Sequence, residues 1–569
     1  MTTQPTASDR PGTGAMNLDA PTDFVSVVDE RRAALDRADF VRRLWKRDPS
    51  LWPGGRKQRP LGFLGRIAAE QERHRRYAFL RRTVRDRGVD RVLWLGMGGA
   101  SLFAEVASRT LRGEEGVALT VVDTTDPTAL RSVARDVDPG RTLAVVASKS
   151  GTTLETTLLE AWATSLLEPA GDPRRRLAYV TDPGSPMDRR AREAGVFAVF
   201  PGERDVGGRF SATTDFGLVP AALAGADVGA LLDAAAPMEA ACRVGKVSAN
   251  PGADLGAVLA AAEAAERRYL TILPDEPWRP LCAWIEQLVA ESTGKAGRGL
   301  LPLWDEPQGE AILGEDRLVV RLVGERPSEV QDALAAEARA AGTPVVTIRA
   351  GAAQERVLAE VVRWQVAVAT CGHLMEIDPF DQPDVEATKA ATRRMLEGEV
   401  LRPEPDFVGD GFEVRGDVPA AAPRLVGALA TLAGAVRRGD YLAVLAYLPP
   451  TAELADALGR LRAEFRAARG IAVAGGWGPR YLHASGQFHK GGPACGAFLV
   501  LTHQAGEDVP VPGRDVTFGA VERAQAAADA AVLRERGRPV LEIEIQAGED
   551  LIEAVGRLAA ACRKALRGA

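Results

Sequence analysis

The sequence predicts an α/β fold with two tandem, doubly wound parallel-sheet units and flanking helices. Short apolar runs rich in β-branched residues recur along the chain, and such runs suit strands that are buried on both faces of a sheet. Helical stretches separate most runs of the first set, and strands that alternate with helices favour a parallel sheet. A helical segment divides the runs into two sets, so we expect two units in tandem.

The first 90 residues carry no run of this kind. Residues 1–22 are rich in Thr, Pro, Gly, Asp and Ala, so we expect a disordered tail there. Residues 23–90 are expected to form N-terminal helices. The stretch Arg66–Arg87 mixes many arginines with apolar residues, which fits a solvated helix face better than a nucleic-acid surface.

The strand-like runs mark the two units and what joins them. The first subdomain is placed at 91–235, with strands at 91–95, 117–122, 142–147, 177–181 and 196–200. A helical connection is placed at 236–268. The second subdomain is placed at 269–549, with strands at 269–273, 317–323, 344–349, 441–448, 497–502 and 539–545. We expect a closing helix over 550–569.

Composition and charge exclude several classes of protein. Of the 569 residues, 46% are hydrophobic and 26% are charged, which is unlike a disordered or collagen-like chain. Lys and Arg number 71 against 77 Asp and Glu, so the net charge of −6 argues against nucleic-acid binding by the chain as a whole. The five cysteines form no CxxC pair, so neither a cysteine zinc site nor a disulfide framework is indicated. With no signal peptide and no long apolar run, we expect a cytoplasmic protein.

A glycine-rich turn follows the first predicted strand of the first subdomain. Residues 95–102 read LGMGGASL, with Gly96, Gly98 and Gly99 between a strand and a helix. Such a turn lets the backbone approach a ligand closely. The pattern is not GxGxxG, so no dinucleotide site is indicated, and a plain tight turn is the alternative.

A loop rich in hydroxyl groups follows the third predicted strand. Residues 148–156 read SKSGTTLET, so Ser148, Ser150 and Thr153 lie where a helix begins. Unpaired backbone N–H groups and the helix dipole favour an anion there, and the hydroxyls add donors for a phosphate. The alternative is a simple capping box formed by Thr152 and Glu155. The order of residues is not that of a Walker A loop.

These segments resemble a known family. The glycine turn, VVDTTDP (121–127) and the hydroxyl loop together resemble a sugar isomerase (SIS) domain. Four further segments, 206–223, 284–295, 377–389 and 478–493, extend the resemblance to the glucose-6-phosphate isomerase family, most closely to the isomerase half of bacterial transaldolase–isomerase fusions. The likeness covers about residues 30–569.

The resemblance carries expectations for fold, activity and assembly. It implies that both units are SIS-type subdomains. It also implies reversible isomerisation of glucose 6-phosphate and fructose 6-phosphate through a cis-enediolate, as in glycolysis and gluconeogenesis. Such chemistry needs neither a metal nor a nucleotide cofactor. The expected partners are a sugar phosphate and a second copy of the chain in a homodimer, with no nucleic acid and no membrane.

The resemblance also implies roles for individual residues. Glu291 matches the base that moves a proton between C2 and C1, and partial burial would bring its pKa towards the working range. Arg209 matches the arginine that faces the enediolate, and Lys490 matches the lysine near the ring oxygen. Contacts with the sugar phosphate are expected from Gly98, Gly99, Ser101, Ser148, Lys149, Ser150, Thr152, Thr153, Gly208, Gln287 and Gln487.

Two positions depart mildly from the family pattern. Ala100 stands where a serine is common, so either its neighbour Ser101 supplies the hydroxyl or one hydrogen bond to the phosphate is lost. Such a loss is worth about 1.5–3 kcal/mol. Asp378 stands where asparagine is usual.

The third departure concerns ring opening. Many family members carry a histidine 20–30 residues after the base, but this chain has none between Glu291 and His373. His489, beside Lys490, is the predicted replacement. His483 is the second candidate.

Two other functions stay open. One is an isomerase with a shifted choice of sugar, such as mannose 6-phosphate. The other is a non-catalytic phosphosugar-binding protein, because SIS folds also serve as regulatory modules. Retention of Glu291, Arg209 and Lys490 together favours the enzyme, since a sensor needs no enediol base.

Overall fold

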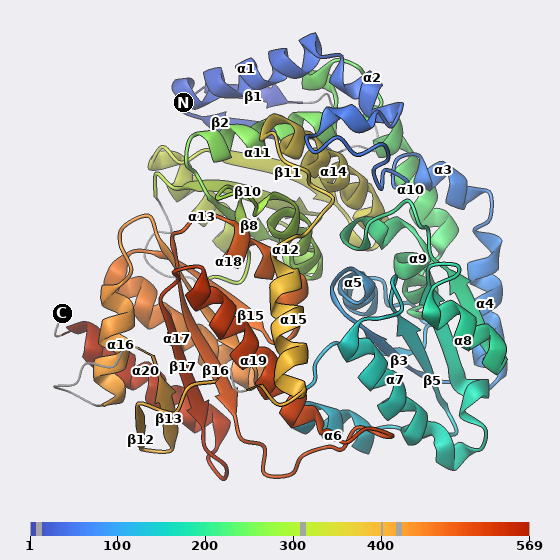
Figure 1. Cartoon of the computed structure of the whole chain (residues 1–569). Helices are drawn as coiled ribbons and strands as arrows, with labels where there is room; N and C mark the ends of the chain where they lie inside the picture. Colours follow the sequence, from blue (N-terminus) through green and yellow to red (C-terminus); the bar gives the residue numbers. More distant parts are fainter. Residues whose placement is uncertain (1, 7–13, 308–313, 400–401, 417–423, 568–569) are drawn as a thin grey trace.

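The computed structural model describes residues 2–6, 14–307, 314–399, 402–416 and 424–567. Its strands form three sheets, one of five strands and two of six, in which parallel pairs predominate. Helices flank the sheets (Figure 1). The predicted α/β class is therefore confirmed. No helix in the described ranges combines the length and the apolar character needed to cross a membrane.

The first sheet contains the five strands predicted for the first subdomain. All its pairs are parallel, in the order β4 (Ala118–Val122), β3 (Arg91–Gly96), β5 (Thr142–Ala147), β6 (Leu177–Thr181) and β7 (Ala198–Pro201). The crossovers are α5 (Leu102–Thr110), α6 (Pro127–Arg135), α7 (Leu154–Leu167) and α8 (Pro186–Ala194). Connections diverge at β3 and β5, and ligands of open α/β sheets bind at such a switch point.

Successive residues of β3 belong to different cores. Val92 and Trp94 pack in one hydrophobic cluster, whereas Leu93 and Leu95 pack in another. Side chains of a strand alternate between faces, so the sheet is buried on both sides. This burial explains why the strands read as continuous apolar runs.

The second sheet has the order β1 (Thr2–Thr6), β2 (Met16–Ala20), β11 (Val345–Gly351), β10 (Arg317–Gly324), β8 (Tyr269–Pro274) and β9 (Leu301–Leu303). Strand β2 runs antiparallel to β11. The expected disordered tail is therefore wrong for residues 2–6, which form β1, and for residues 16–20, which form β2. Met16, Leu18 and Ala20 alternate into the core, and pairing with an edge strand orders a segment too polar to order itself.

The sequence analysis did not predict the third sheet as a separate unit. Its order is β12 (Phe407–Gly409), β13 (Phe412–Arg415), β17 (Val540–Ile545), β16 (Gly496–His503), β14 (Tyr441–Ala446) and β15 (Ala472–Trp477). The predicted 269–549 subdomain thus contains two sheets. An apolar run in the sequence predicts a strand but does not show which strand it pairs with. Along the chain, α14 (Ala353–Leu374) and α15 (Val385–Leu396) lie between β11 and the strands of the third sheet.

The remaining helices cover the sheets and connect them. The amino-terminal helices are α1 (Thr22–Arg37), α2 (Phe40–Trp45), α3 (Arg66–Gln71) and α4 (Arg75–Asp86). The segment after the first sheet forms α9 (Asp215–Leu223), α10 (Val228–Ala241), α11 (Pro251–Ala264) and α12 (Arg279–Thr293). The second and third sheets carry α13 (Glu329–Ala340), α16 (Leu425–Gly434), α17 (Ala452–Arg469), α18 (Gly486–Gly491), α19 (Phe518–Glu535) and α20 (Leu551–Arg567).

The arginine-rich stretch 66–87 makes contacts within the protein. Arg73 contacts Glu70 and Glu203, and Arg76 lies 2.6 Å from Asp215. These pairs join the amino-terminal helices to the segment that follows β7 and to α9.

Candidate active site

A cavity of about 1150 Å³ lies at the switch point of the first sheet. The loops after β3 and β5 form one side, and residues of α12, α15 and α18 form the other. It is lined by many of the predicted site residues, namely Gly98, Gly99, Ser148, Lys149, Ser150, Thr152, Thr153, Gly208, Arg209, Gln287, Glu291 and Lys490. Segments far apart in the sequence therefore meet at one cavity.

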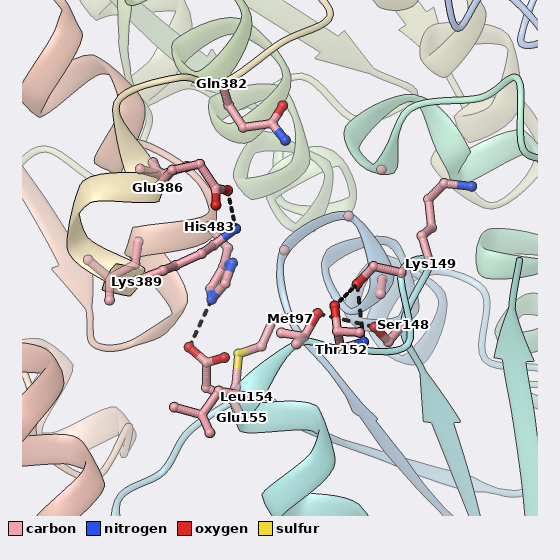
Figure 2. A pocket seen from close by; sticks show the side chains of 18 of the residues that line it. Met97, Ser148, Lys149, Thr152, Leu154, Glu155, Gln382, Glu386, Lys389 and His483 are labelled. Atoms are coloured by element: carbon pink, nitrogen blue, oxygen red, sulfur yellow. Dashed lines mark hydrogen bonds and ion pairs between the residues drawn. The ribbon is translucent and has the colours of Figure 1, made fainter. Parts of the chain in front are cut away.

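The hydroxyl loop is folded by its own side chains. Ser148 Oγ accepts the Gly151 N–H at 3.1 Å and contacts Thr153 Oγ1 at 3.1 Å, while Ser150 Oγ accepts the Thr152 N–H at 3.2 Å. Gly151 has φ +68°, a conformation that glycine adopts without strain. Figure 2 shows this loop at the edge of the cavity.

The first turn of α7 is open to a ligand. Thr153 is its N-cap residue, but no side chain caps the helix. The capping-box alternative is therefore wrong, because Thr152 is not the N-cap residue and its N–H donates to Ser150 Oγ instead of to Glu155. Thr153, Leu154 and Glu155 at this end of α7 line the cavity, and the N–H groups and dipole of a helix N-terminus suit a phosphate.

Lys149 lines the cavity but its ammonium group is held elsewhere. Nζ lies 2.6 Å from Asp182 Oδ1 and donates to Glu203 O at 2.8 Å. Burial lowers the pKa of Lys149, opposed by the charge of Asp182. The phosphate contact expected from Lys149 therefore has to come from its backbone or after the ion pair opens.

The glycine turn after β3 is shaped by close approaches. Gly98 has φ +54°, and a Cβ there would come within 2.8 Å of His483 O and 2.9 Å of Gln287 Nε2. A Cβ on Gly99 would overlap Gly208 O and lie 2.7 Å from Arg209 N. Only glycine therefore lets this turn pack against the segment that carries Arg209.

Gly99→Ala is expected to destabilise the fold by about 1–3 kcal/mol, the usual cost of overpacking. The added methyl group pushes against backbone, which cannot rotate away, so Arg209 shifts and activity falls at least about tenfold. Denaturant unfolding and a rate assay measure the two effects. Gly208→Ala is the control for stability, because its Cβ meets no atom within 4 Å. Equal stability of the two variants would contradict the packing account.

Glu291 presents both carboxylate oxygens to residues of the cavity. Oε1 lies 2.8 Å from Arg209 Nη1, and Oε2 accepts a hydrogen bond from Gln287 Nε2 at 3.0 Å. Gln287 also donates to His483 O at 2.8 Å. The helix α12 places Gln287 and Glu291 one turn apart on the same face, as expected. The side chain of Glu291 remains 12% exposed, so it faces the cavity.

All five donors of Arg209 are bound by the protein. Nε donates to Ser292, and Nη1 donates to Glu291 and to Gln382 Oε1 at 3.1 Å. Nη2 donates to the carbonyls of Pro379 and Asp381 at 2.7 and 2.9 Å. The segment 378–382, to which the sequence assigned no role, therefore holds the guanidinium in place. A substrate oxygen meets the charge of Arg209 directly only if Glu291 or Gln382 gives up its bond.

Lys490 is a buried cation with a buried counter-ion. Its Nζ lies 2.5 Å from Asp529 Oδ1 in α19, and both side chains are 0% exposed. Asp529 also accepts hydrogen bonds from Tyr481 Oη at 2.5 Å and Thr388 Oγ1 at 3.1 Å. The ammonium group is therefore fixed at the cavity wall.

Lys490→Met is expected to lower stability by about 3–5 kcal/mol, because it leaves the Asp529 carboxylate buried without its partner. Adding Asp529→Asn should recover a large part of that loss, since the uncompensated charge disappears, while catalytic activity stays lost. Urea unfolding of the two variants and the parent measures the coupling. If Lys490→Met alone were as stable as the parent, the buried ion pair would be contradicted.

Three predicted site residues do not line the cavity. Ser101 is buried and its Oγ contacts Asp123 Oδ2 at 3.1 Å, so it does not replace the hydroxyl missing at Ala100. Gln487 is buried and donates to Gly294 O and Asp384 Oδ2 at 2.8 and 2.7 Å. The hydrogen bonds of these two side chains tie them to neighbouring loops, away from the cavity lining.

His489 is the third of these residues, and its predicted place at the cavity is wrong. Its Nδ1 lies 2.8 Å from Tyr441 Oη, and its ring packs against Tyr441 and Phe498. Burial and the charge of Lys490 lower the pKa of His489 to about 3. Of the two histidines proposed for ring opening, His489 is therefore a core residue.

His483 is the histidine that reaches the cavity. Its Nε2 lies 3.0 Å from Glu155 Oε1, and Figure 2 shows the two side chains facing each other. Gln525 Nε2 donates to the same Glu155 oxygen at 2.7 Å. The charge of His483 and its hydrogen bond, together with the backbone hydrogen bond to Glu155, outweigh burial and lower the pKa of Glu155. An imidazole oriented by Glu155 therefore lines the cavity.

Helix α15 contributes residues that the sequence analysis did not select. Lys389 contacts Glu386 at 2.7 Å (Figure 2). The cavity-lining residues of this helix are Val385, Glu386, Thr388, Lys389, Ala390, Thr392, Arg393 and Leu396. Lys389 and Arg393 are four residues apart, but the same spacing occurs on any solvated helix face, so the pattern carried no specific signal.

Comparison with known proteins agrees with these observations. The family model for phosphoglucose isomerase matches residues 82–317. The glucose-6-phosphate isomerase of Rubrobacter xylanophilus is 30% identical over 361 residues, which cover 54% of this chain and 83% of the relative. That of Synechococcus sp. (strain JA-3-3Ab) is 37% identical over 211 residues, or 36% of this chain and 40% of the relative.

A solved structure shares the fold. A glucose-6-phosphate isomerase from Chlamydia trachomatis aligns with a TM-score of 0.52 at 18% identity, over 68% of this chain and 89% of that one. The region matched by the family model, residues 82–317, includes the glycine turn, the hydroxyl loop and Glu291. The chain belongs to the phosphoglucose isomerase family.

Proposed function

We propose that the protein interconverts glucose 6-phosphate and fructose 6-phosphate. The observation that carries the proposal is the shared cavity of a phosphate-type loop, Ser148–Thr153, and a hydrogen-bonded carboxylate, Glu291, beside the charge of Arg209. Aldose–ketose isomerisation needs an anion site, a base and a cation near the developing oxyanion. The names of the relatives support the choice of sugar.

Substrate binding starts at the hydroxyl loop. The phosphate accepts hydrogen bonds from the uncapped N–H groups of α7 and from the hydroxyls of Ser150 and Thr152, which border the cavity. Lys389 and Arg393 of α15 add positive charge across the cavity. This anchor orients the sugar chain so that its carbonyl end points towards α12.

Ring opening requires proton transfer between the anomeric hydroxyl and the ring oxygen. We assign this step to His483, because it lines the cavity and Glu155 orients its ring through Nε2. The ammonium group of Lys490 adds a fixed positive charge to the cavity lining. His489 takes no part, since it is enclosed by aromatic side chains.

Isomerisation then moves a proton on one face of the open chain. Glu291 takes the C2 proton of the aldose, and the enediolate forms with its charge on the oxygens of C1 and C2. The same carboxyl returns the proton to C1, and the hydroxyl proton passes from the oxygen of C2 to that of C1, which gives the ketose. Arg209 stabilises the negative charge through its fixed guanidinium, which cannot lose a proton.

The direct test is turnover of fructose 6-phosphate by the purified chain, followed through a dehydrogenase specific for glucose 6-phosphate. Turnover supports the proposal, and parallel assays with mannose 6-phosphate measure whether the choice of sugar is shifted. If no sugar phosphate turns over but fructose 6-phosphate raises the melting temperature, the protein is a phosphosugar-binding module instead. Light scattering tests the homodimer that the family resemblance implies.

A further inference from the structure

A second cluster of ligand-type side chains lies outside the active-site cavity. Asp126 is the N-cap of α6, His503 ends β16, and Glu522 lies near the start of α19. One possible ligand atom from each residue lies within 4.8 Å of the other two, and all three residues are buried. Because α6 belongs to the first sheet and β16 to the third, the cluster joins two parts of the molecule.

The cluster is rich in acceptors and poor in donors. Asp126 Oδ1 accepts the Ala129 N–H at 2.7 Å, and Oδ2 lies 2.5 Å from His503 Nε2. Glu522 is 4% exposed, and its Oε1 is buried without a hydrogen-bond partner. A buried carboxylate oxygen that lacks a donor costs free energy. Arg523 and Asp508, the other charges that act on Glu522, have opposite signs.

We propose that Asp126, His503 and Glu522 bind one divalent transition-metal ion of the zinc class. One imidazole with two carboxylates suits Zn²⁺, whereas Mg²⁺ and Ca²⁺ prefer sites made only of oxygen. With bonds of about 2.0–2.2 Å, tetrahedral ligand atoms lie about 3.3–3.6 Å apart. His503 Nε2 and Asp126 Oδ2 therefore separate by roughly 1 Å when the ion enters, and Glu522, whose Oε1 has no hydrogen-bond partner, supplies the third ligand atom.

The ion would support the active site through the next residues of the same elements. Thr125, beside Asp126, donates to Gln525 Oε1 at 3.1 Å. Gln525, three residues after Glu522, donates to Glu155 Oε1 at 2.7 Å, and Glu155 faces His483. A cross-link at the cluster would fix α19 against α6 and so hold Glu155 in place. Ion binding itself does not depend on the proposed reaction.

The test uses the full chain after removal of metal with a chelator. Zn²⁺ bound per chain is measured by atomic emission after desalting, and the melting temperature is recorded with and without Zn²⁺. Co²⁺ is added in parallel, because its visible absorption reports a low-coordinate site directly. The variants are Glu522→Gln and His503→Gln. Glu535→Gln, an exposed position of the same helix, is the matched control, and His483→Gln controls for binding in the cavity.

The parent and both controls should bind one Zn²⁺ per chain and melt several degrees higher with it. Glu522→Gln and His503→Gln should lose at least about tenfold in affinity. The Co²⁺ spectrum of the parent answers the question even if a variant fails to fold. If the parent bound less than one Zn²⁺ per chain, the proposal would be overturned. The cluster would then be held together by a proton instead of a metal ion. Uptake that survives both substitutions would overturn it by placing the ion elsewhere.

Discussion

Glu291→Gln is expected to lower turnover of fructose 6-phosphate by about 10²–10⁴-fold, the usual contribution of a positioned acid–base group. A carboxamide keeps the size of the side chain and an oxygen that accepts from Gln287 or Arg209, but it cannot hold the migrating proton. The Michaelis constant should change little, because the phosphate loop is untouched. Steady-state kinetics with the coupled assay measure both quantities.

The matched control is Glu286→Gln on the same helix. Glu286 accepts a hydrogen bond from Trp304 Nε1 at 2.8 Å and does not line the cavity. Its substitution should leave turnover within a few-fold of the parent. Arg209 keeps its bonds to Ser292, Gln382 and two carbonyls in Glu291→Gln, so the melting temperature should hold. Full activity of Glu291→Gln would remove this residue from the reaction.

His483→Gln has the second largest expected effect, a loss of about 10²-fold or more on cyclic sugar phosphates. The glutamine can still hydrogen-bond to Glu155, but it cannot relay a proton to the ring oxygen. Erythrose 4-phosphate has no hydroxyl placed to close a five- or six-membered ring, so it bypasses this step. The ratio of the two rates, measured for parent and variant, isolates ring opening.

A comparable loss on both substrates would contradict the assignment and make His483 a positioning residue for Glu155 or Gln287. His489→Gln is the companion variant, because His489 lies on α18 six residues away but is enclosed by aromatic rings. His489→Gln should lower stability but leave unchanged the ratio of the rates on the cyclic sugar phosphate and on erythrose 4-phosphate. A selective loss on the cyclic sugar in His489→Gln would restore the sequence-based choice.

The strands of the first sheet could be read from the sequence because burial on both faces makes them continuous apolar runs. Strands β9 and β15 lack that signal, since β9 has three residues and β15 contains Gly475 and Gly476. Strand β2 depends on its partner β11, 325 or more residues away in the chain, which local composition does not reveal. Pairing partners also decide that the second half contains two sheets.

The site was predictable where chemistry depends on local pattern. The hydroxyl loop and the spacing of Gln287 and Glu291 are such patterns, and the structure brings them to one cavity. The choice between His483 and His489 depends on a turn, Arg480–His483, that points one ring at Glu155 and leaves the other on the core face of α18. The anchoring of Arg209 by carbonyls of 379 and 381 is equally invisible, because backbone acceptors carry no sequence signature.

The central claim is that one cavity binds the phosphate at the hydroxyl loop and presents the sugar carbons to Glu291. A crystal structure of Glu291→Gln with fructose 6-phosphate tests it most directly. The account predicts phosphate oxygens within hydrogen-bond distance of the loop Ser148–Thr153, and C1 and C2 within about 3–3.5 Å of the side chain at position 291. A phosphate bound at Lys389 and Arg393 instead, with the carbon chain turned away from α12, would contradict it.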